Sequence, residues 1–115
     1  MSTRAENIEV VEEYMNSLKR RDVRSMPFAD DLTFEDPIAG KGTGAENRRA
    51  FLSGFLLAVR DFRVHQFVCE GEYVVAYWEV DSIWGPIGIL EKFQVQNGKI
   101  TDTVAYFDPR LIVGS

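Results

Sequence analysis

The second half of the chain is an almost unbroken succession of strand-type segments, and this constrains the fold more than any other feature. Residues 62–70, 73–82, 87–96 and 99–107 are rich in Val, Tyr, Phe and Trp, the residue types that favour half-buried strands. Asn97-Gly98 between the last two segments predicts a tight hairpin turn. Consecutive strands with short connections pair antiparallel, so we expect a four-stranded antiparallel sheet here.

Two helices and one further strand are expected before this sheet. Thr3 and Glu6 have capping-box spacing, and apolar residues then recur at helical spacing, which predicts a helix over about 4–21. A short helical turn is expected over 23–29. A short strand is expected over 32–36, where Pro37 ends it.

The second helix is expected to follow a glycine-rich loop. Residues 39–44 include three glycines, and Thr43 with Glu46 repeats the capping-box spacing. A wide apolar stripe then indicates a helix that packs on the core; it comprises Phe51, Leu52, Phe55, Leu56 and Val59. Residues 83–86 are expected to form a longer turn between two strands.

This order of elements predicts an α+β fold. Helices that precede a run of strands are typical of that class, and the length of 115 residues suits one domain, 1–115. We expect a curved antiparallel sheet with the N-terminal helices forming a cone-shaped α+β barrel around a pocket. A pocket between a sheet and its helices is a common ligand site.

Composition excludes several classes of function. The net charge of −5 argues against nucleic acid, which needs a basic surface. The single cysteine, Cys69, excludes an internal disulfide or a cysteine metal site, and the single histidine, His65, makes a serine-hydrolase triad hard to build. The longest apolar run is too short to cross a membrane, and residues 1–10 lack the apolar core of a signal peptide. We expect a cytoplasmic protein without a membrane partner.

One acidic residue lies on the apolar face of a predicted strand. Period-two alternation puts Glu91 on the same face as Ile89 and Phe93. A carboxyl group there would face a low-dielectric interior, where ionisation is disfavoured. The alternatives are an internal ion pair, or a bulge that turns Glu91 outward.

Two further polar groups are candidates for the same interior. Asp36 shares a strand face with Leu32 and Phe34, although an Asp before Pro37 is also a common turn residue. Tyr14 lies at the edge of the first helix's apolar stripe, where it is either a half-buried core residue or a donor aimed into a cavity. Two inward acids and a phenol suit proton transfer beside a carbonyl group, with one base and two donors.

The chain resembles the ketosteroid isomerases within the nuclear-transport-factor-2-like, or SnoaL-like, superfamily. The resemblance rests on V-V-E-E-Y-M-N-S-L at 10–18, F-A-D-D-L-T-F-E-D-P-I at 28–38 and, more loosely, P-I-G-I-L-E-K-F-Q-V at 86–95. It implies that Asp36 is the general base, and that Tyr14 and a protonated Glu91 are the oxyanion donors. Glu91 replaces the family's Asp, Leu52 stands where a second Tyr is common, and the loop 83–88 differs.

A second resemblance covers residues 93–108, which are similar to the end of limonene epoxide hydrolase. That enzyme uses an Asp-Arg-Asp set. Asp81 matches one acid, but Glu79 stands at the arginine position and Ala105 at the second acid. The epoxide hydrolase mechanism is therefore not expected. A His-Asp pair of the polyketide cyclase type would need an inward partner for His65.

Together these resemblances imply an isomerase-like enzyme that moves a proton on a small apolar carbonyl compound. The alternatives are a non-catalytic module that binds small molecules or a dimer partner, and a polyketide cyclase-like enzyme. No cofactor or metal is implied, and a homodimer is expected from the superfamily. The expected ligand-binding walls are aromatic residues close in sequence to the acids: Phe28, Phe34, Phe55, Trp84 and Phe93.

Overall fold

The computed structural model describes residues 3–114. Its elements are α1 (Arg4–Arg20), the 3-10 helix η1 (Val23–Ser25), β1 (Phe28–Asp36), β2 (Gly40–Thr43), α2 (Ala45–Leu56), β3 (Val59–Glu70), β4 (Tyr73–Ser82), β5 (Gly85–Gln96), β6 (Lys99–Tyr106) and α3 (Arg110–Val113). The predicted succession of helix, strand, helix and four strands is present, and β2 and α3 are additional elements. The predicted α+β class is confirmed.

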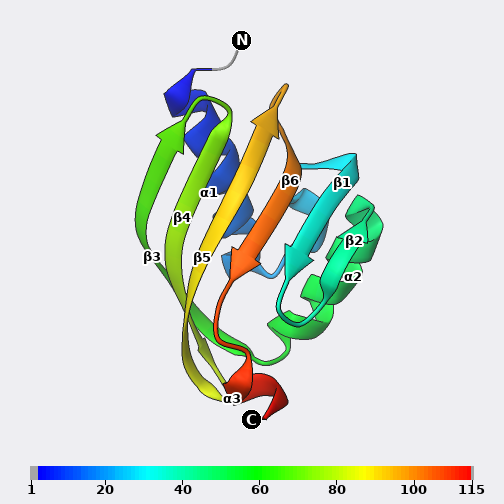
Figure 1. Ribbon diagram of the computed structural model, residues 1–115, viewed down its shortest axis with the longest axis vertical. Coiled ribbons are helices and arrows are strands. Elements are labelled where there is room, and N and C mark those ends of the chain that lie inside the picture. The colour runs from blue at the N-terminus through cyan, green and yellow to red at the C-terminus, as the bar shows by residue number, and fades with distance from the viewer. Residues whose placement is uncertain (1–2, 115) are drawn as a thin grey trace.

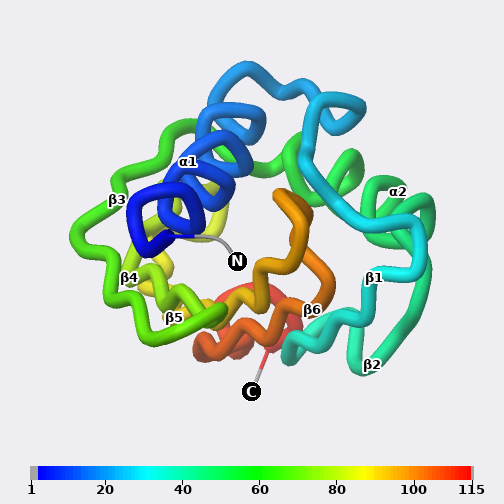
Figure 2. Tube along the Cα trace, turned by 90° about the horizontal axis from the view of Figure 1, so that it is seen from above, coloured from blue at the N-terminus to red at the C-terminus, as the bar shows by residue number. Residues whose placement is uncertain are grey.

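The strands form one curved sheet in the order β2-β1-β6-β5-β4-β3. Figure 2 shows this sheet curving around one side of the molecule, with α1 and α2 covering its inner face. The four strands β3 to β6 pair antiparallel, as predicted. Strand β1, however, pairs with β6 in parallel. Over the described residues the sheet is therefore mixed rather than wholly antiparallel, and it stays open between β2 and β3 (Figure 1).

Helix α1 begins at the predicted capping box. The Thr3 hydroxyl accepts a hydrogen bond from the Glu6 N–H at 3.1 Å, and the Thr3 N–H donates to the Glu6 carboxylate at 3.2 Å. The helix ends at Arg21, whose φ of 59° is left-handed and whose N–H donates to the Leu18 carbonyl. Its buried face places Tyr14 over the inner face of the sheet.

The second predicted capping box is wrong, and so is the loop predicted over 39–44. Residues Gly40–Thr43 form strand β2, and Thr43 is paired with Thr33 of β1. Because Thr43 is held in this extended pairing, the N-cap of α2 is Gly44, and it provides no side-chain hydrogen bond. Gly42 is needed in β2 because the Phe34 ring lies where a Cβ atom would be.

Other boundaries also differ from the prediction. Val59, expected on the apolar stripe of the second helix, begins β3, because α2 ends at Leu56. Strand β1 begins at Phe28 instead of residue 32, so the helical turn expected over 23–29 shrinks to Val23–Ser25. Its pairing with β6 shifts register between Phe28 and Thr33, where Asp30 and Asp31 are exposed. The turn expected over 83–86 is also shorter, because β5 begins at Gly85.

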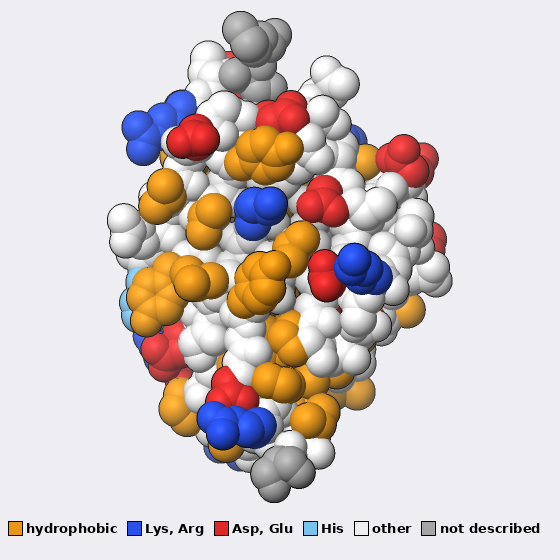
Figure 3. Space-filling view, viewed as in Figure 1, with side chains coloured by type: hydrophobic (Ala, Val, Ile, Leu, Met, Phe, Trp, Pro, Cys, Tyr) orange, Lys and Arg blue, Asp and Glu red, His pale blue; other side chains and the backbone are white. Residues whose placement is uncertain are grey.

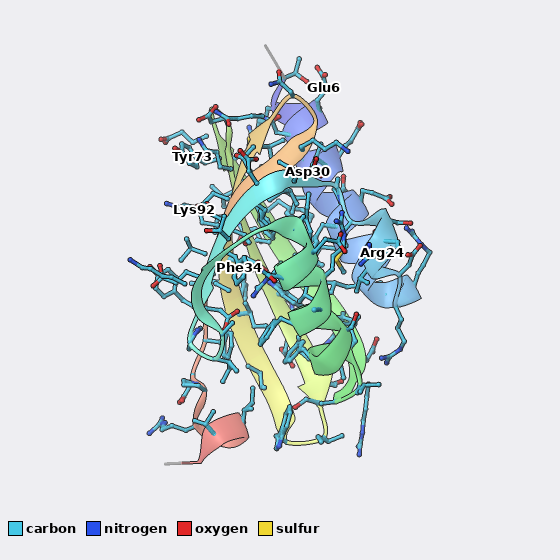
Figure 4. The ribbon with its side chains drawn as sticks, turned by 90° about the vertical axis from the view of Figure 1, so that its right-hand side faces the viewer. Glu6, Arg24, Asp30, Phe34, Tyr73 and Lys92 are labelled. Atoms are coloured by element: carbon cyan, nitrogen blue, oxygen red, sulfur yellow. The ribbon has the colours of Figure 1, made fainter. Side chains whose placement is uncertain are left out.

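Burial alternates along β4 and β5 as strand geometry requires. The inner face and the two long helices enclose the core, while the outer face is open to solvent. Figure 4 shows Tyr73 and Lys92 on the outer face and Phe34 between β1 and α2. Within residues 3–114 no helix is long and apolar enough to span a membrane.

Candidate functional site

A small cavity lies between the inner face of the sheet and the two long helices. Its volume is about 30 Å³, room for one or two water molecules. It brings together the three residues predicted to carry the chemistry, one each from α1, β1 and β5. The lining residues are Tyr14, Asp36, Arg48, Phe51, Leu52, Phe55, Trp78, Ile89, Glu91, Ala105 and Phe107.

Glu91 faces the interior, as strand alternation predicts. It is 1% exposed, and its Oε2 accepts a 2.5 Å hydrogen bond from the Thr103 hydroxyl of β6. Burial raises the pKa of Glu91, and this effect outweighs the lowering by the Arg48 charge and the Thr103 hydrogen bond. The Glu91 carboxyl therefore tends toward the protonated form, in which it can donate a hydrogen bond.

Tyr14 is packed between two rings that fix its position. The centroids of Phe28 and Phe93 lie 5.6 and 5.4 Å from that of Tyr14, within the range of favourable aromatic pairs. Within residues 3–114 its hydroxyl has no hydrogen-bond partner, although it lines the cavity. Burial, and then the nearby Glu91 charge, raise the pKa of Tyr14 well above its usual value, so it remains a neutral donor.

Asp36 is both a turn residue and an inward residue. Its Oδ1 accepts hydrogen bonds from the N–H groups of Ile38 and Ala39, each at 2.7 Å. Its Oδ2 accepts a 2.5 Å hydrogen bond from Nη1 of Arg48. The Asp36 side chain is only 1% exposed, so the protein encloses it almost completely. One lone pair of Oδ2 remains for another partner.

Arg48 is the functional-site residue that sequence reasoning missed. It lies on α2 with a side chain 4% exposed, and its guanidinium carbon lies 5.2 and 5.1 Å from the ring centroids of Phe34 and Phe51. Burial lowers the pKa of Arg48, but the nearby oxygens of Tyr14, Glu91 and Asp36 outweigh it and raise the pKa. Helical spacing could have indicated its burial, because Arg48 lies one turn before buried Leu52 and so on the same face of the helix.

Trp78 is a second cavity residue without an expected site role. It lies on the inner face of β4, together with buried Val74 and Val80. It lines the cavity next to Glu91 and contributes to lowering the pKa of that carboxyl. Its buried Nε1–H nevertheless meets no acceptor at hydrogen-bonding geometry.

The structure changes the role of most expected wall residues. Phe55 lines the cavity, and its contact with a ligand stays a prediction. Phe28 and Phe93 pack against Tyr14 instead, and Phe34 packs against Arg48. Trp84 lies in the turn between β4 and β5, away from the cavity lining. Phe28, Phe34 and Phe93 therefore support residues of the site, and Trp84 lies outside it. The cavity is smaller than the number of aromatic residues suggested.

The remaining candidate residues lie on the outer face of the sheet. The Arg63 guanidinium binds Asp81 at 2.8 and 3.0 Å and Glu79 at 2.6 Å. His65 contacts Glu79, and its ring is tilted against that of Tyr77 with centroids 4.8 Å apart, so it forms no pair with the cavity acids. Among residues 3–114 there is no group of three side chains suited to hold a metal ion.

Solved structures with this fold include proteins with different activities. The chain aligns with a nuclear-transport-factor-2-like protein of unknown function from Cytophaga hutchinsonii at 22% identity and a TM-score of 0.81, covering 96% of each chain. It aligns with a steroid delta-isomerase from Pseudomonas aeruginosa at 21% identity and a TM-score of 0.78, covering 95% of this chain and 84% of that one.

An LEH-like epoxide hydrolase from M. tuberculosis aligns at 22% identity and a TM-score of 0.75, over 91% of this chain and 84% of that one. At these identities the likeness establishes the fold alone. No curated protein matches the chain. The sequence does match the SnoaL-like domain over residues 11–103, most of its length. The chain therefore belongs to the SnoaL-like domain family.

Proposed function

We propose that this protein catalyses proton transfer at the carbon next to the carbonyl group of a small apolar compound, as in double-bond isomerisation. Asp36 removes the proton, and the C–H electrons form a carbon–carbon double bond as the carbonyl oxygen becomes an enolate. Tyr14 and protonated Glu91 donate hydrogen bonds to that oxygen. Asp36 then returns the proton to another carbon of the substrate, so no cofactor is consumed.

The observation that carries this proposal is the contrast between two buried carboxyl groups at one cavity. Asp36 accepts three hydrogen bonds, one of them from a guanidinium, so both of its oxygens act as acceptors, as those of a base do. Glu91 has one hydroxyl partner, and burial raises its pKa. A base and an acid in the same site are what enolisation requires.

Two features imply a modest catalyst. Arg48 donates a hydrogen bond to Asp36 Oδ2, which leaves fewer lone pairs of that oxygen for the substrate proton. Leu52 lines the cavity, so it provides no second phenol to support the oxyanion donors. A substrate also needs more room than about 30 Å³, so half-buried rings such as Phe51 and Phe107 must move when it enters.

The test is the conversion of cyclohex-3-enone, a small β,γ-unsaturated ketone, to its conjugated isomer, followed by ultraviolet absorbance. Asp36→Asn should lower the rate by about 10²–10⁴, and Tyr14→Phe by about 10²–10³. Tyr73→Phe, on the outer face, is the matched control and should keep the wild-type rate. Equal rates for wild type and Asp36→Asn would remove the proposal.

A non-catalytic binding module is the second candidate, and the Arg48–Asp36 ion pair favours it. This contact occupies the oxygen that a base would use. Under this alternative, ligands bind in the cavity with wild-type affinity in Asp36→Asn, and no proton is transferred.

A homodimer that forms through the outer face of the sheet is part of the proposal. Large apolar side chains gather on this face (Figure 3), and the exposed ones are Val68, Tyr73, Tyr77, Leu90 and Tyr106. Such a patch is typical of an interaction surface. Analytical ultracentrifugation of wild type and Leu90→Lys tests it, because a charge at this position should yield monomers. We also propose that the protein is cytoplasmic.

A further inference from the structure

The cavity holds more hydrogen-bond donors than the protein satisfies. A guanidinium has five N–H donors, and within residues 3–114 that of Arg48 makes one hydrogen bond, to Asp36. Its buried Nε has no partner, and neither has Nε1 of Trp78. A buried donor left without an acceptor costs about 1–3 kcal/mol, so this cavity is built to receive acceptor atoms.

The surroundings of Arg48 leave N–H groups of its guanidinium available to a ligand. The rings of Phe34 and Phe51 lie at 5.2 and 5.1 Å from its guanidinium carbon. Aromatic rings at this distance attract a cation but do not accept a conventional hydrogen bond. They fix the planar guanidinium, whose fork of donors matches a carboxylate better than a single carbonyl oxygen.

The rest of the lining suits an apolar body. The rings of Phe51 and Phe55 are stacked, with centroids 6.4 Å apart and planes 7° from parallel. Both line the cavity together with Phe107, and all three are half-buried. They form an apolar passage between α2 and the end of β6. An aromatic or aliphatic group can lie along these rings while its polar end reaches Arg48.

We propose that the ligand is a small 2-oxo acid with an apolar side chain. Its carboxylate accepts hydrogen bonds from Nε of Arg48 and Nε1 of Trp78, and its keto oxygen accepts from Tyr14 and Glu91. The small cavity favours adjacent polar groups, as a 2-oxo acid has. The proposal rests on the proposed function for the role of the keto group, and it adds the carboxylate that fixes the substrate.

The charges around such a ligand are compatible with binding. Arg48 from α2 is the facing cation, Asp36 from β1 is the facing anion, and Tyr14 from α1 and Glu91 from β5 complete the titratable groups. Glu91 adds little repulsion while it is protonated. In the enolisation step the C3–H bond breaks and the proton passes to Asp36. The C–H electrons form the C2–C3 double bond, and the π electrons of the carbonyl group move to the keto oxygen.

Calorimetry with three matched probes tests this assignment. Phenylpyruvate carries both polar groups, phenylacetone has methyl in place of the carboxylate, and 3-phenylpropanoate lacks the keto group. Wild type should bind phenylpyruvate at least about tenfold more tightly than either of the others, because each lacks hydrogen bonds worth about that factor. Equal affinity for phenylacetone would overturn the role of the carboxylate. Equal affinity for 3-phenylpropanoate would overturn the role of the keto group.

Two conservative variants test where the carboxylate of the ligand binds, and both keep a large side chain in the core. Trp78→Phe deletes one donor and keeps an aromatic ring, and Trp84→Phe is its control outside the cavity. Arg48→Lys keeps the charge and deletes the guanidinium fork, and Arg49→Lys is its control on the same helix. Trp78→Phe and Arg48→Lys should each lower the affinity for phenylpyruvate about tenfold. The affinity for phenylacetone should stay unchanged. Equal losses for both ligands would overturn the assignment.

Exchange at C3 separates this inference from the proposed function. In D₂O, wild type should exchange the C3 protons of bound phenylpyruvate faster than Asp36→Asn does. If wild type binds phenylpyruvate preferentially but both proteins exchange its C3 protons at the same rate, the 2-oxo acid site stands and the proposed catalysis is overturned. If wild type exchanges the corresponding protons of phenylacetone and binds it as tightly as phenylpyruvate, the proposed catalysis stands and the carboxylate site is overturned.

Discussion

Arg48 Nη1 lies 2.5 Å from Asp36 Oδ2, and both side chains are almost completely buried. This ion pair joins α2 to the end of β1, across the cavity that also holds Tyr14 and Glu91. Desolvation of two charges is costly, and their attraction offsets that cost only while both partners are present. Loss of one partner would therefore leave the other charge buried without its counter-ion.

Removal of one partner should be strongly destabilising. Arg48→Met leaves the Asp36 charge buried and unpaired, which should lower the free energy of unfolding by about 3–5 kcal/mol. Urea denaturation followed by far-UV circular dichroism measures this loss. The exposed Arg110–Asp108 pair is the control, and Arg110→Met should leave the urea midpoint nearly unchanged. A midpoint for Arg48→Met equal to that of wild type would contradict the structure.

The stability of the protein should depend on pH through Glu91. Its pKa is raised in the folded state, so between the two pKa values the folded protein binds more protons than the unfolded chain. The contribution of Glu91 is then fully present below pH 4.5 and declines as pH rises through the folded pKa. Glu91→Gln should therefore gain stability relative to wild type from pH 4 to pH 9.

Denaturation midpoints of wild type and Glu91→Gln across that range measure the effect. Glu70→Gln, an exposed change at the end of β3, is the control and should run parallel to wild type. A difference between wild type and Glu91→Gln that stays constant from pH 4 to pH 9 would mean that burial does not shift the pKa.

The close approach of β2 to Phe34 gives a third prediction. A Cβ atom added at Gly42 would lie 2.7 Å from Cε1 of Phe34, so Gly42→Ala should destabilise the protein by about 1–3 kcal/mol. Gly88→Ala is the matched control, because a Cβ atom at Gly88 has no neighbour within 4 Å. Thermal unfolding of both variants checks the difference, and equal melting temperatures would contradict the packing.

Local patterns were sufficient where one short-range rule determines the structure. Period two along a strand placed Glu91 inward, and the spacing of Thr3 and Glu6 located the start of α1. The same capping rule failed at Thr43 because strand pairing with Thr33 holds that residue in β2. The parallel contact of β1 with β6 joins segments about 70 residues apart, and no local pattern encodes it.

The site was predicted in part for a related reason. The resemblance indicated Tyr14, Asp36 and Glu91, and the structure brings them to one cavity. Arg48 was missed because a charged residue on a helix is normally solvated. What permits its burial is Asp36, twelve residues earlier and on another element. The size of the cavity also depends on packing, which residue composition does not fix.

The central claim is that Asp36 removes a proton from carbon, and isotope exchange tests it most directly. Proton NMR in D₂O can follow loss of the signals at the carbon between the carbonyl and the double bond of cyclohex-3-enone, before any net isomerisation is required. The account predicts rapid exchange with wild type and, with Asp36→Asn, a rate close to that of buffer alone. Equal exchange with both proteins, at equal ligand affinity, would contradict it.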